Sequence, residues 1–313
     1  MSFVGDFMRV LVTGAAGFIG ASLYIYLIDK GYEVVGIDSY ERPSAPLLSI
    51  LERRSLEVYR VDVLDREGLK KVLGDVDGVV HLAAYIDVGE SMVQPWKYIY
   101  NNVLGTASIL DLCREVGINR FIFISSASVY GDPEYLPIDE EHPLKPLSPY
   151  GYSKVLGEYI GKMYSEVYGM DVIILRLFNV YGFGQSSEYA GVIAKFIDRV
   201  LDGLPPVIYG DGLQTRDFIY VYDVCEAISL ALRYRGGYEI FNIASGRDVS
   251  IRDLAYLIIN LSGRDLKPIY MEAREGDIRY SVADISRARE RLGFTAKTDL
   301  EDGIKSMLSQ YMG

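Results

Sequence analysis

The sequence predicts an α/β fold in which a doubly wound parallel sheet carries helices on both faces. Two observations predict it. Short apolar strands alternate with helical segments through the first half of the chain, and a glycine-rich turn joins the first strand to the first helix. With 313 residues, 50% of them hydrophobic, the chain can bury a large core. A smaller, interleaved α/β part is expected after residue 180.

The first unit has the order strand, turn, helix, strand. Arg9–Thr13 is a short apolar strand, Ala21–Lys30 is helical and Val34–Asp38 is the next strand. The turn Gly14–Gly20 has small residues where the backbone must approach a phosphate at the N-terminus of a helix. Asp38 ends the second strand, where a carboxylate can bind the ribose of an adenine dinucleotide. The unit therefore predicts a Rossmann-type dinucleotide site.

The acidic residue also predicts which dinucleotide binds. The carboxylate of Asp38 would repel a 2′-phosphate, which favours NAD over NADP, although the nearby Arg42 leaves NADP open. The alternative is a glycine-rich turn without a ligand, because the spacing differs from Gly-x-Gly-x-x-Gly. The flanking strands and the position of Asp38 favour the dinucleotide.

Further buried strands extend the predicted sheet. They are Leu56–Val61, Gly78–Leu82 and Arg120–Ile124. The residues at their carboxyl ends are Asp62, Ala83-Ala84 and Ser125-Ser126. Ligands of parallel sheets lie outside the carboxyl ends of the strands, so these residues are expected to face one shared site.

Tyr150 and Lys154 are a candidate catalytic pair. Residues at i and i+4 share one face of a helix, and Ser148 followed by Pro149 is typical of a helix start. A nearby ammonium favours the ionised phenol, whose ordinary pKa is about 10, so Tyr150 is the predicted base. Tyr152 lies on a different face and is discounted. Taken alone, the pair is a weak signal, and an amphipathic helix with a surface lysine is the more common explanation of such spacing.

Composition excludes several classes of protein. A net charge of −11 argues against nucleic-acid binding, and no apolar run is long enough to span a membrane. Without a signal-peptide pattern, a cytoplasmic protein is expected, with Cys113 and Cys225 as buried thiols. Besides these cysteines the chain has only His81 and His142, so no metal site is expected.

An ordered series of motifs carries a family resemblance. They are Gly14-x-x-Gly17-x-x-Gly20, Asp62, His81–Ala84, Asn102–Thr106, Ser125–Gly131, Tyr150-x-x-x-Lys154, Arg176–Gly182, Arg216–Asp223, Phe241–Gly246, Arg274–Asp277 and Ala283–Ala288. Over essentially its whole length the chain resembles the extended short-chain dehydrogenase/reductases of the NAD-dependent epimerase/dehydratase family. Within that family it is most similar to the UDP-glucose 4-epimerases.

The resemblance implies a division into two domains. The NAD-binding Rossmann domain would comprise residues 1–180 and about 215–235, because Phe218–Leu232 looks like a strand and helix returning to it. The nucleotide-sugar-binding domain would comprise residues 181–214 and 236–313. The resemblance also implies a homodimer formed through helices around Gln94–Glu115 and Tyr150–Tyr168.

The resemblance further implies epimerisation at C4 of a UDP-hexose, UDP-glucose or UDP-galactose, through a 4-keto intermediate. Tyr150 would take the proton of the 4-hydroxyl while hydride leaves C4 for NAD. Lys154 would lower the pKa of Tyr150 and bind the nicotinamide ribose. Ser126 would bind the same substrate hydroxyl. NAD would stay tightly bound between cycles.

The remaining site residues are transferred from the family by position. The implied cofactor contacts are Gly14, Gly17, Phe18, Ile19, Gly20, Asp38, Asp62, Val63, Leu82, Ala83, Ala84, Asn102, Tyr150 and Lys154. The implied substrate contacts are Ser126, Asn179, Val192, Tyr209, Arg216, Arg274 and Ser281. The two arginines match guanidinium groups that clamp a diphosphate, and a surface ion pair is the alternative for each.

Departures from the family pattern reduce the number of reactions that we expect of this chain. Ala127 and Ser128 stand where dehydratases of the family tend to carry an acid, which argues against a dehydratase or decarboxylase. Ile86 replaces a lysine usual near the sugar. Ser281 replaces a tyrosine that limits space at the sugar C2 group, so UDP-N-acetylhexosamines are also expected as substrates. A non-catalytic NAD sensor is a further alternative, against which the intact Ser126 and Tyr150 argue.

Overall fold

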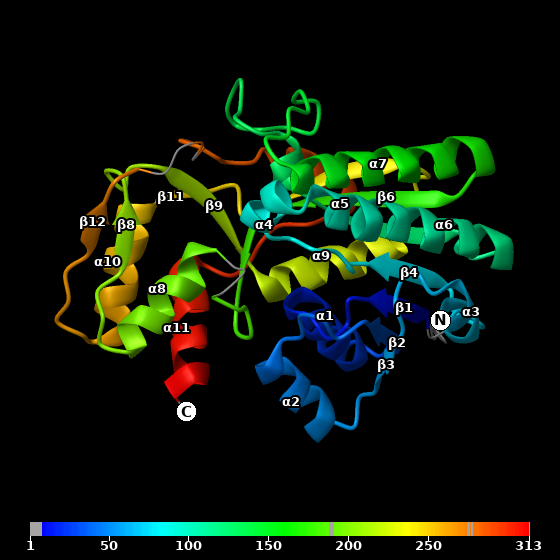
Figure 1. Ribbon diagram of the computed structural model, residues 1–313, viewed down its shortest axis with the longest axis horizontal. Helices are drawn as coiled ribbons and strands as arrows, with labels where there is room; N and C mark the ends of the chain where they lie inside the picture. Colours follow the sequence, from blue (N-terminus) through cyan, green and yellow to red (C-terminus); the bar gives the residue numbers. More distant parts are fainter. Residues whose placement is uncertain (1–7, 188–190, 274–275, 277, 313) are drawn as a thin grey trace.

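A computed structural model describes residues 8–187, 191–273, 276 and 278–312 (Figure 1). In this part of the chain a seven-stranded sheet has the order β10-β6-β5-β4-β1-β2-β3, and every pair of neighbours is parallel. Its strands are β1 (Arg9–Thr13), β2 (Glu33–Asp38), β3 (Val58–Arg60), β4 (Gly78–His81), β5 (Arg120–Ser126), β6 (Asp171–Leu177) and β10 (Glu239–Ile243). The predicted parallel sheet is confirmed.

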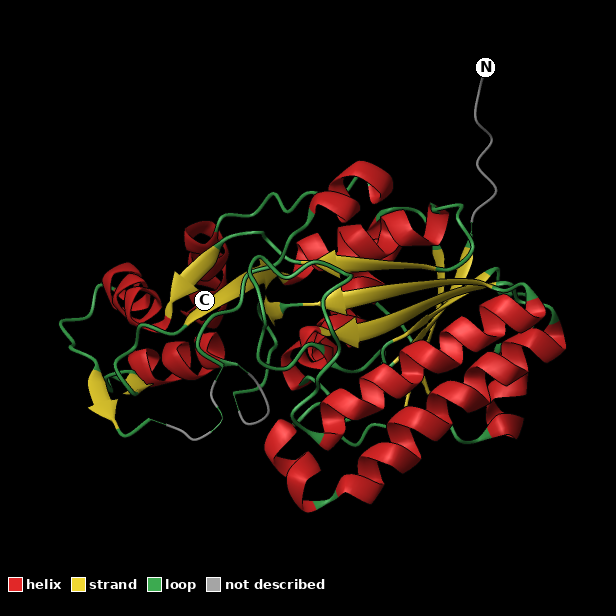
Figure 2. Cartoon of the chain, turned by 90° about the horizontal axis from the view of Figure 1, so that it is seen from above, coloured by secondary structure: helices red, strands yellow, loops and turns green. Residues whose placement is uncertain are grey.

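Helices cover both faces of this sheet (Figure 2). One face carries α1 (Phe18–Asp29), α9 (Val221–Arg233) and, beside α1, α2 (Ala45–Arg53). The other carries α3 (Arg66–Val72), α6 (Gly105–Val116) and α7 (Pro149–Tyr168). Side chains alternate between the two cores: Val10 and Val12 pack toward α1 and α9, and Leu11 packs toward α3 and α6.

Short helical segments connect the larger elements of this domain. They are α4 (Val88–Val93), α5 (Pro95–Tyr98), the π-helical η1 (Ile99–Leu104), which continues into α6, and the 3₁₀ turn η2 (Ala127–Val129) after β5. The first helix begins at Phe18, three residues before its predicted start, because Gly17 already serves as its N-cap. The predicted strand Leu56–Val61 is shorter, as β3.

The smaller part of the molecule is built on two small sheets. Strands β7 (Asn179–Tyr181), β9 (Thr215–Tyr220) and β11 (Asp248–Ser250) form one, and β8 (Val207–Tyr209) and β12 (Ile269–Met271) form the other. Helices α8 (Val192–Leu201), α10 (Ile251–Ser262) and α11 (Leu300–Met312) cover them around a separate apolar core. The π-helical η3 (Ala288–Leu292) packs against β10 and α9.

The two parts interleave along the chain. The strand and helix expected at Phe218–Leu232 are β9 and α9; α9 packs against α1 on the large sheet, whereas β9 belongs to the three-stranded sheet. Strand β10 pairs in parallel with β6 in the large sheet, although it falls in the range 236–313 assigned to the smaller domain. The physical reason is that β10 presents buried apolar residues to β6 and completes the core beneath α9.

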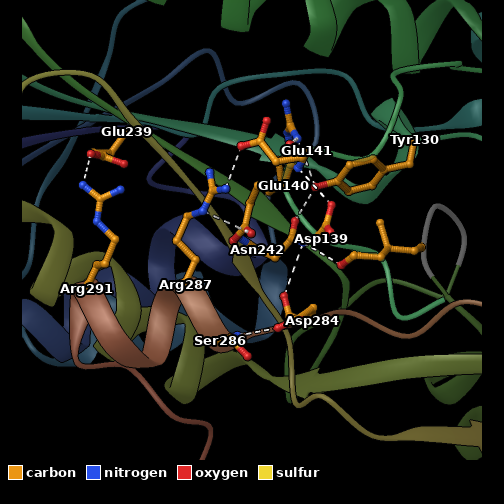
Figure 3. A network of polar contacts seen from close by, with 12 residues as sticks. Tyr130, Asp139, Glu140, Glu141, Glu239, Asn242, Asp284, Ser286, Arg287 and Arg291 are labelled. Carbon is orange, nitrogen blue, oxygen red and sulfur yellow. Dashed lines mark hydrogen bonds and ion pairs between the residues drawn. The ribbon is translucent and has the colours of Figure 1, made fainter. Parts of the chain in front are cut away.

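A polar network fastens the loop after η2 to β10 and η3 (Figure 3). Asn242 accepts a hydrogen bond from the Tyr130 hydroxyl at 2.5 Å and donates one to the carbonyl of Ile138 at 2.9 Å. Arg287 is ion-paired with Glu140 at 3.5 Å. Buried polar groups are costly unless paired, so these contacts fix the loop.

Among the described helices, none has the length and apolar character needed to cross a membrane.

Candidate active site

A cavity of about 590 Å³ lies at the carboxyl ends of the large sheet and extends to the smaller sheets. Most of the predicted site residues line it. They are Gly14, Gly17, Phe18, Ile19, Gly20, Asp38, Asp62, Val63, Leu82, Ala83, Ala84, Ser126, Tyr150, Lys154, Asn179, Val192, Tyr209 and Arg216. The structure thus gathers residues that are up to 200 positions apart in sequence into one site of the size that small-molecule ligands occupy.

The glycine-rich turn forms one end of this cavity. Gly14 has a φ of +69°, and a Cβ on Gly20 would lie 2.0 Å from the carbonyl oxygen of Gly14, so only glycine allows this close packing. Helix α1 starts here with Gly17 as its N-cap and without a side-chain cap. Its first N–H groups therefore face the cavity without a side-chain partner, as in a phosphate site.

Asp38 lines the cavity at the end of β2, and two backbone N–H groups hold its carboxylate. One oxygen accepts a hydrogen bond from the N–H of Ala16 at 3.0 Å, and the other accepts one from the N–H of Tyr40 at 2.6 Å. Burial raises the pKa of its carboxyl, and the two N–H groups oppose this rise. A carboxylate has about four acceptor positions, so it can still bind a diol. Arg42, which left NADP open, is ion-paired with Glu90 at 2.6 Å.

His81 is a structural residue behind the strand ends. Its ring nitrogens lie 2.8 Å from the Thr13 hydroxyl and 3.1 Å from the Thr106 hydroxyl, and Thr13 also accepts from the N–H groups of Leu82 and Ala83. Complete burial lowers the pKa of His81 to about 3, so the ring is neutral at pH 7. These bonds join the ends of β1 and β4 and fix the cavity floor.

Tyr150 projects from the first turn of α7 beside the end of β5. The predicted helix start is confirmed: the Ser148 side chain accepts a hydrogen bond from the N–H of Gly151 at 3.1 Å, and Pro149 is the first helical residue. Tyr150 is 9% exposed and Tyr152 is 57% exposed. The structure therefore places Tyr150 in the cavity and Tyr152 on the surface, as predicted.

The electrostatics of Tyr150 differ from the prediction. Burial raises the pKa of the phenol, and the adjacent hydroxyls of Ser126 and Ser128 act in the opposite direction. The ammonium of Lys154 instead donates a hydrogen bond to the carbonyl of Ile124 at 2.8 Å and is not among the groups that shift this pKa. The i,i+4 spacing predicted the shared helix face, but it could not show that a backbone carbonyl competes for the ammonium. Ser128 beside Tyr150 was also missed.

Lys154 is buried and held by a polar cluster beneath it. Burial lowers the pKa of its ammonium to about 8, and the charge of Glu158, one turn further along α7, acts to raise it. Glu158 accepts a hydrogen bond from Ser125 at 2.5 Å and is bound by Arg176 at 3.0 and 2.7 Å. The pair of Glu158 and Arg176 is almost fully buried.

The sequence analysis missed this cluster, although a signal was present. Glu158 follows Lys154 by four residues and therefore shares its helix face, and Arg176 is a charged residue inside the otherwise apolar strand β6. A charge at such a position requires a buried partner. The cluster links α7, β5 and β6 directly below Ser126 and Lys154.

The opposite wall of the cavity comes from the smaller sheets. Arg216 lies on β9, where one guanidinium nitrogen donates to the carbonyl of Thr215 at 2.8 Å. Asn179 on β7 donates to the carbonyl of Asp217 at 2.9 Å. Gln214, which the sequence analysis did not select, donates to the carbonyl of Tyr209 at 2.9 Å and also lines the cavity. A guanidinium here suits an anionic group such as a diphosphate.

Two of the predicted residues that the structure describes do not line the cavity. Asn102 lies behind the cavity wall, where its amide accepts from the N–H of Tyr85 and donates to the carbonyl of the same residue, both at 2.9 Å. Ser281 is buried and lies outside the residues that line the cavity. Arg274 lies outside the described residues.

The described residues contain no group of three His, Cys, Asp or Glu side chains arranged to hold a metal ion. Cys113 and Cys225 are both buried, as predicted, and burial raises the pKa of the Cys113 thiol to about 12.

Comparison with known proteins agrees with this geometry. The chain belongs to the NAD dependent epimerase/dehydratase family, whose model matches residues 10–244. A UDP-glucose 4-epimerase of Mycolicibacterium smegmatis is 37% identical over 302 residues, which cover 95% of this chain and 96% of that protein. The predicted family and the fold class are confirmed, and NAD is the cofactor of the family.

Solved structures of two relatives superpose on the whole chain. A UDP-glucose 4-epimerase from Thermotoga maritima, solved with UDP-glucose, has a TM-score of 0.92 and 34% identity, covering 97% of this chain and 99% of that one. A UDP-N-acetylglucosamine 4-epimerase from Methanobrevibacter ruminantium, solved with UDP-N-acetylmuramic acid, has a TM-score of 0.92 and 35% identity, covering 97% and 98%. The likeness thus includes the smaller sheets as well as the dinucleotide half.

Proposed function

We propose that this protein is an NAD-dependent 4-epimerase of UDP-hexoses that interconverts UDP-glucose and UDP-galactose through a 4-keto intermediate. One observation carries the proposal. Ser126, Tyr150 and Lys154 lie in the same cavity as the glycine-rich turn, with Arg216 on the facing wall. Relatives of this chain with that activity match it over nearly its full length.

Tyr150 and Ser126 have different roles in the proposed reaction. Tyr150 takes the proton of the sugar 4-hydroxyl, and Ser126 hydrogen-bonds the same oxygen as it becomes a ketone. When bound, NAD would supply the chemistry for hydride transfer at C4. Ala127 and Ser128 supply no carboxylate beside this ketone, so elimination or decarboxylation lacks a local acid. Reversal of the hydride transfer is then the favoured outcome.

The two walls bind the two nucleotides. Gly14, Gly17 and Gly20 with the start of α1 would hold the NAD pyrophosphate, and Asp38 would bind its adenosine ribose. The proposed UDP-sugar contacts on the facing wall are Asn179, Val192, Tyr209 and Arg216. Arg274, which lies outside the described residues, is proposed as a further contact from the family resemblance alone. The cavity also contains the remaining cofactor residues Phe18, Ile19, Asp62, Val63, Leu82, Ala83 and Ala84.

UDP-N-acetylhexosamines are proposed as further substrates. Ser281 is a small side chain where some relatives carry a tyrosine, and it leaves room for a C2 N-acetyl group. A structurally similar relative is a UDP-N-acetylglucosamine 4-epimerase. Because Ser281 lies just outside the cavity lining, its effect on substrate choice would be smaller than that of residues that contact the sugar.

A homodimer is proposed because an apolar face is exposed along α4 to α7. Its exposed members include Val88, Met92, Val93, Trp96, Tyr100, Tyr152, Tyr159, Met163, Val167 and Tyr168. Large exposed apolar patches mark interaction sites, and α6 and α7 lie side by side, so a second copy of the chain is proposed to pack on these helices. Sedimentation equilibrium should give twice the chain mass of 35.1 kDa.

The test is incubation with UDP-galactose, and separately with UDP-N-acetylglucosamine, without added NAD, followed by separation of the C4 epimers. The proposal predicts UDP-glucose and UDP-N-acetylgalactosamine, each with the mass of its substrate. Loss of water or CO₂ in mass spectrometry would instead show a lyase. Recovery of unchanged substrate by NAD-loaded protein would indicate a binding protein without this activity.

A further inference from the structure

Two loops face one another across the proposed NAD site. Residues 39–44 follow β2, and residues 82–87 follow β4. In the sheet β1 lies between β2 and β4, so side chains that join these loops span the end of β1, where the Gly14–Gly20 turn begins. Glu41, Arg42 and Tyr85 from the two loops all line the cavity. Contacts between them are therefore placed to affect the passage of a dinucleotide.

One polar bridge joins the two loops, and a second joins the loop of residues 39–44 to α4, which follows the other loop. The Tyr85 hydroxyl donates a hydrogen bond to the carboxylate of Glu41. The guanidinium of Arg42 donates to Glu90 at 2.6 Å, and its central carbon lies 5.1 Å from the centroid of the Tyr85 ring. The side chains of Arg42 and Glu90 are only 23% and 20% exposed, so solvent screens this pair less than a surface ion pair. We call Glu41, Arg42, Tyr85 and Glu90 the clasp.

The clasp is anchored on the side of α4 and α5. Lys97 donates to Glu90 at 3.1 Å, and the Tyr98 hydroxyl lies 2.8 Å from the second oxygen of Glu90. Arg42 is the main reason that the pKa of Glu90 is lowered to about 2, so Glu90 is ionised at neutral pH. Glu90 therefore serves as a fixed anion between Arg42 and the two anchoring side chains.

The anchor continues to the proposed catalytic base. Tyr98 is fully buried, and its ring packs edge to face against Tyr150 with 6.4 Å between centroids. Tyr98 thus contacts both Glu90 of the clasp and the ring of Tyr150. If the clasp opened, Tyr98 would lose Glu90 as a neighbour, and Tyr98 is the side chain that packs against Tyr150.

We propose that the clasp retains NAD, so that the cofactor leaves only when the bridge between Glu41 and Tyr85 and the bridge between Arg42 and Glu90 both open. The inference rests on NAD as the cofactor of the proposed epimerase. Residues on both sides of the cleft thereby have a role in NAD retention, although they need not contact the reacting atoms. Retention matters for such an enzyme, because cofactor lost in its reduced form would strand the ketosugar.

The test is the rate at which bound NAD exchanges with excess isotope-labelled NAD, measured on NAD-loaded full-length protein without sugar. Tyr85→Phe removes the hydrogen bond to Glu41 and keeps the aromatic ring. Glu90→Gln removes the charged partner of Arg42. Arg42→Gln breaks the same bridge from its other end. Each loses a hydrogen bond to a charged group, so exchange should be roughly tenfold faster, and faster still in Tyr85→Phe with Glu90→Gln.

A matched control is Tyr135→Phe, because Tyr135 donates a comparable bond to Asp139 at 2.9 Å on the exposed loop away from the cavity. Its exchange rate should equal that of the unmodified protein. Equal rates in the clasp variants, with melting temperatures that show they are folded, would overturn the clasp alone. A protein that binds no NAD would overturn both the clasp and the proposed function.

Discussion

The two walls of the cavity are built in different ways. On the wall of the large sheet, the proposed catalytic side chains are fixed by buried contacts. Lys154 is bound to the carbonyl of Ile124, and Glu158, one helix turn further along, is ion-paired with Arg176. On the opposite wall, Asn179 and Arg216 are partly exposed and come from short strands of a separate sheet. Proton and hydride transfer require accurate placement, whereas recognition of a flexible nucleotide sugar tolerates looser support.

This comparison predicts the largest effect at the buried base. Tyr150→Phe removes the proton acceptor and keeps the ring, so kcat should fall by about 10²–10⁴-fold, the usual contribution of general acid–base catalysis. Tyr152→Phe, two residues away on the exposed face, should leave the rate of UDP-galactose epimerisation unchanged. Similar rates for both variants would show that the base lies elsewhere.

A smaller effect of a different kind is expected on the opposite wall. Arg216→Ala should weaken UDP binding by about 1.5–3 kcal/mol, the range for a hydrogen bond to a charged group. Titration calorimetry with UDP would measure this, and KM should rise by a larger factor than kcat falls. The control is Arg247→Ala, which breaks an exposed pair with Asp299 away from the cavity. A fall in kcat at constant KM would contradict the division between the walls.

Glu158 tests whether the buried cluster tunes the catalytic lysine. Its negative charge raises the pKa of Lys154, and burial lowers that pKa to about 8. In Glu158→Gln the pKa should fall further, so the ammonium is lost at a lower pH, and the alkaline limb of the kcat profile should move to lower pH. Loss of one partner of a buried ion pair should also cost about 3–5 kcal/mol of stability.

The control for this variant is Glu166→Gln on the same helix, where the pair with Lys162 is exposed. It should change neither the pH profile nor the melting temperature. If Glu158→Gln lowers the stability of the protein but does not move the alkaline limb of the kcat profile, the role of Glu158 is structural alone.

The smallest effect is expected at Ser281. Ser281→Tyr should reduce turnover of UDP-N-acetylglucosamine more than that of UDP-galactose, because the larger side chain takes space near the sugar C2 group. The ratio of the two kcat/KM values measures this selectivity. Since Ser281 is buried outside the cavity lining, the change should be modest. An unchanged ratio would show that this position does not select the sugar.

The features that the sequence could predict are those that depend on local patterns. The dinucleotide half follows from local patterns: apolar strands that end in Gly14, Asp38 and Ser126 must meet at one edge of a parallel sheet. The helix start at Ser148 followed from its capping pattern. These features depend on neighbours in sequence, so no knowledge of distant contacts was needed.

Other features depend on contacts that no local pattern specifies. The bond from Lys154 to the carbonyl of Ile124 and the raised pKa of Tyr150 follow from burial by elements far along the chain. Strand β10 joins the large sheet because it pairs with β6 across more than sixty residues, which the predicted domain boundaries did not include. The bridges between Glu41 and Tyr85 and between Arg42 and Glu90 arise in the same way.

The central claim is that the C4 hydrogen is removed and returned within one site that contains Tyr150 and NAD. The most direct measurement uses UDP-galactose carrying deuterium at C4, incubated in ordinary water, with the product examined by mass spectrometry and NMR. The account predicts UDP-glucose that keeps its deuterium at C4, because the same hydride returns to the opposite face. Product with protium from water at C4, or no product at all, would contradict it.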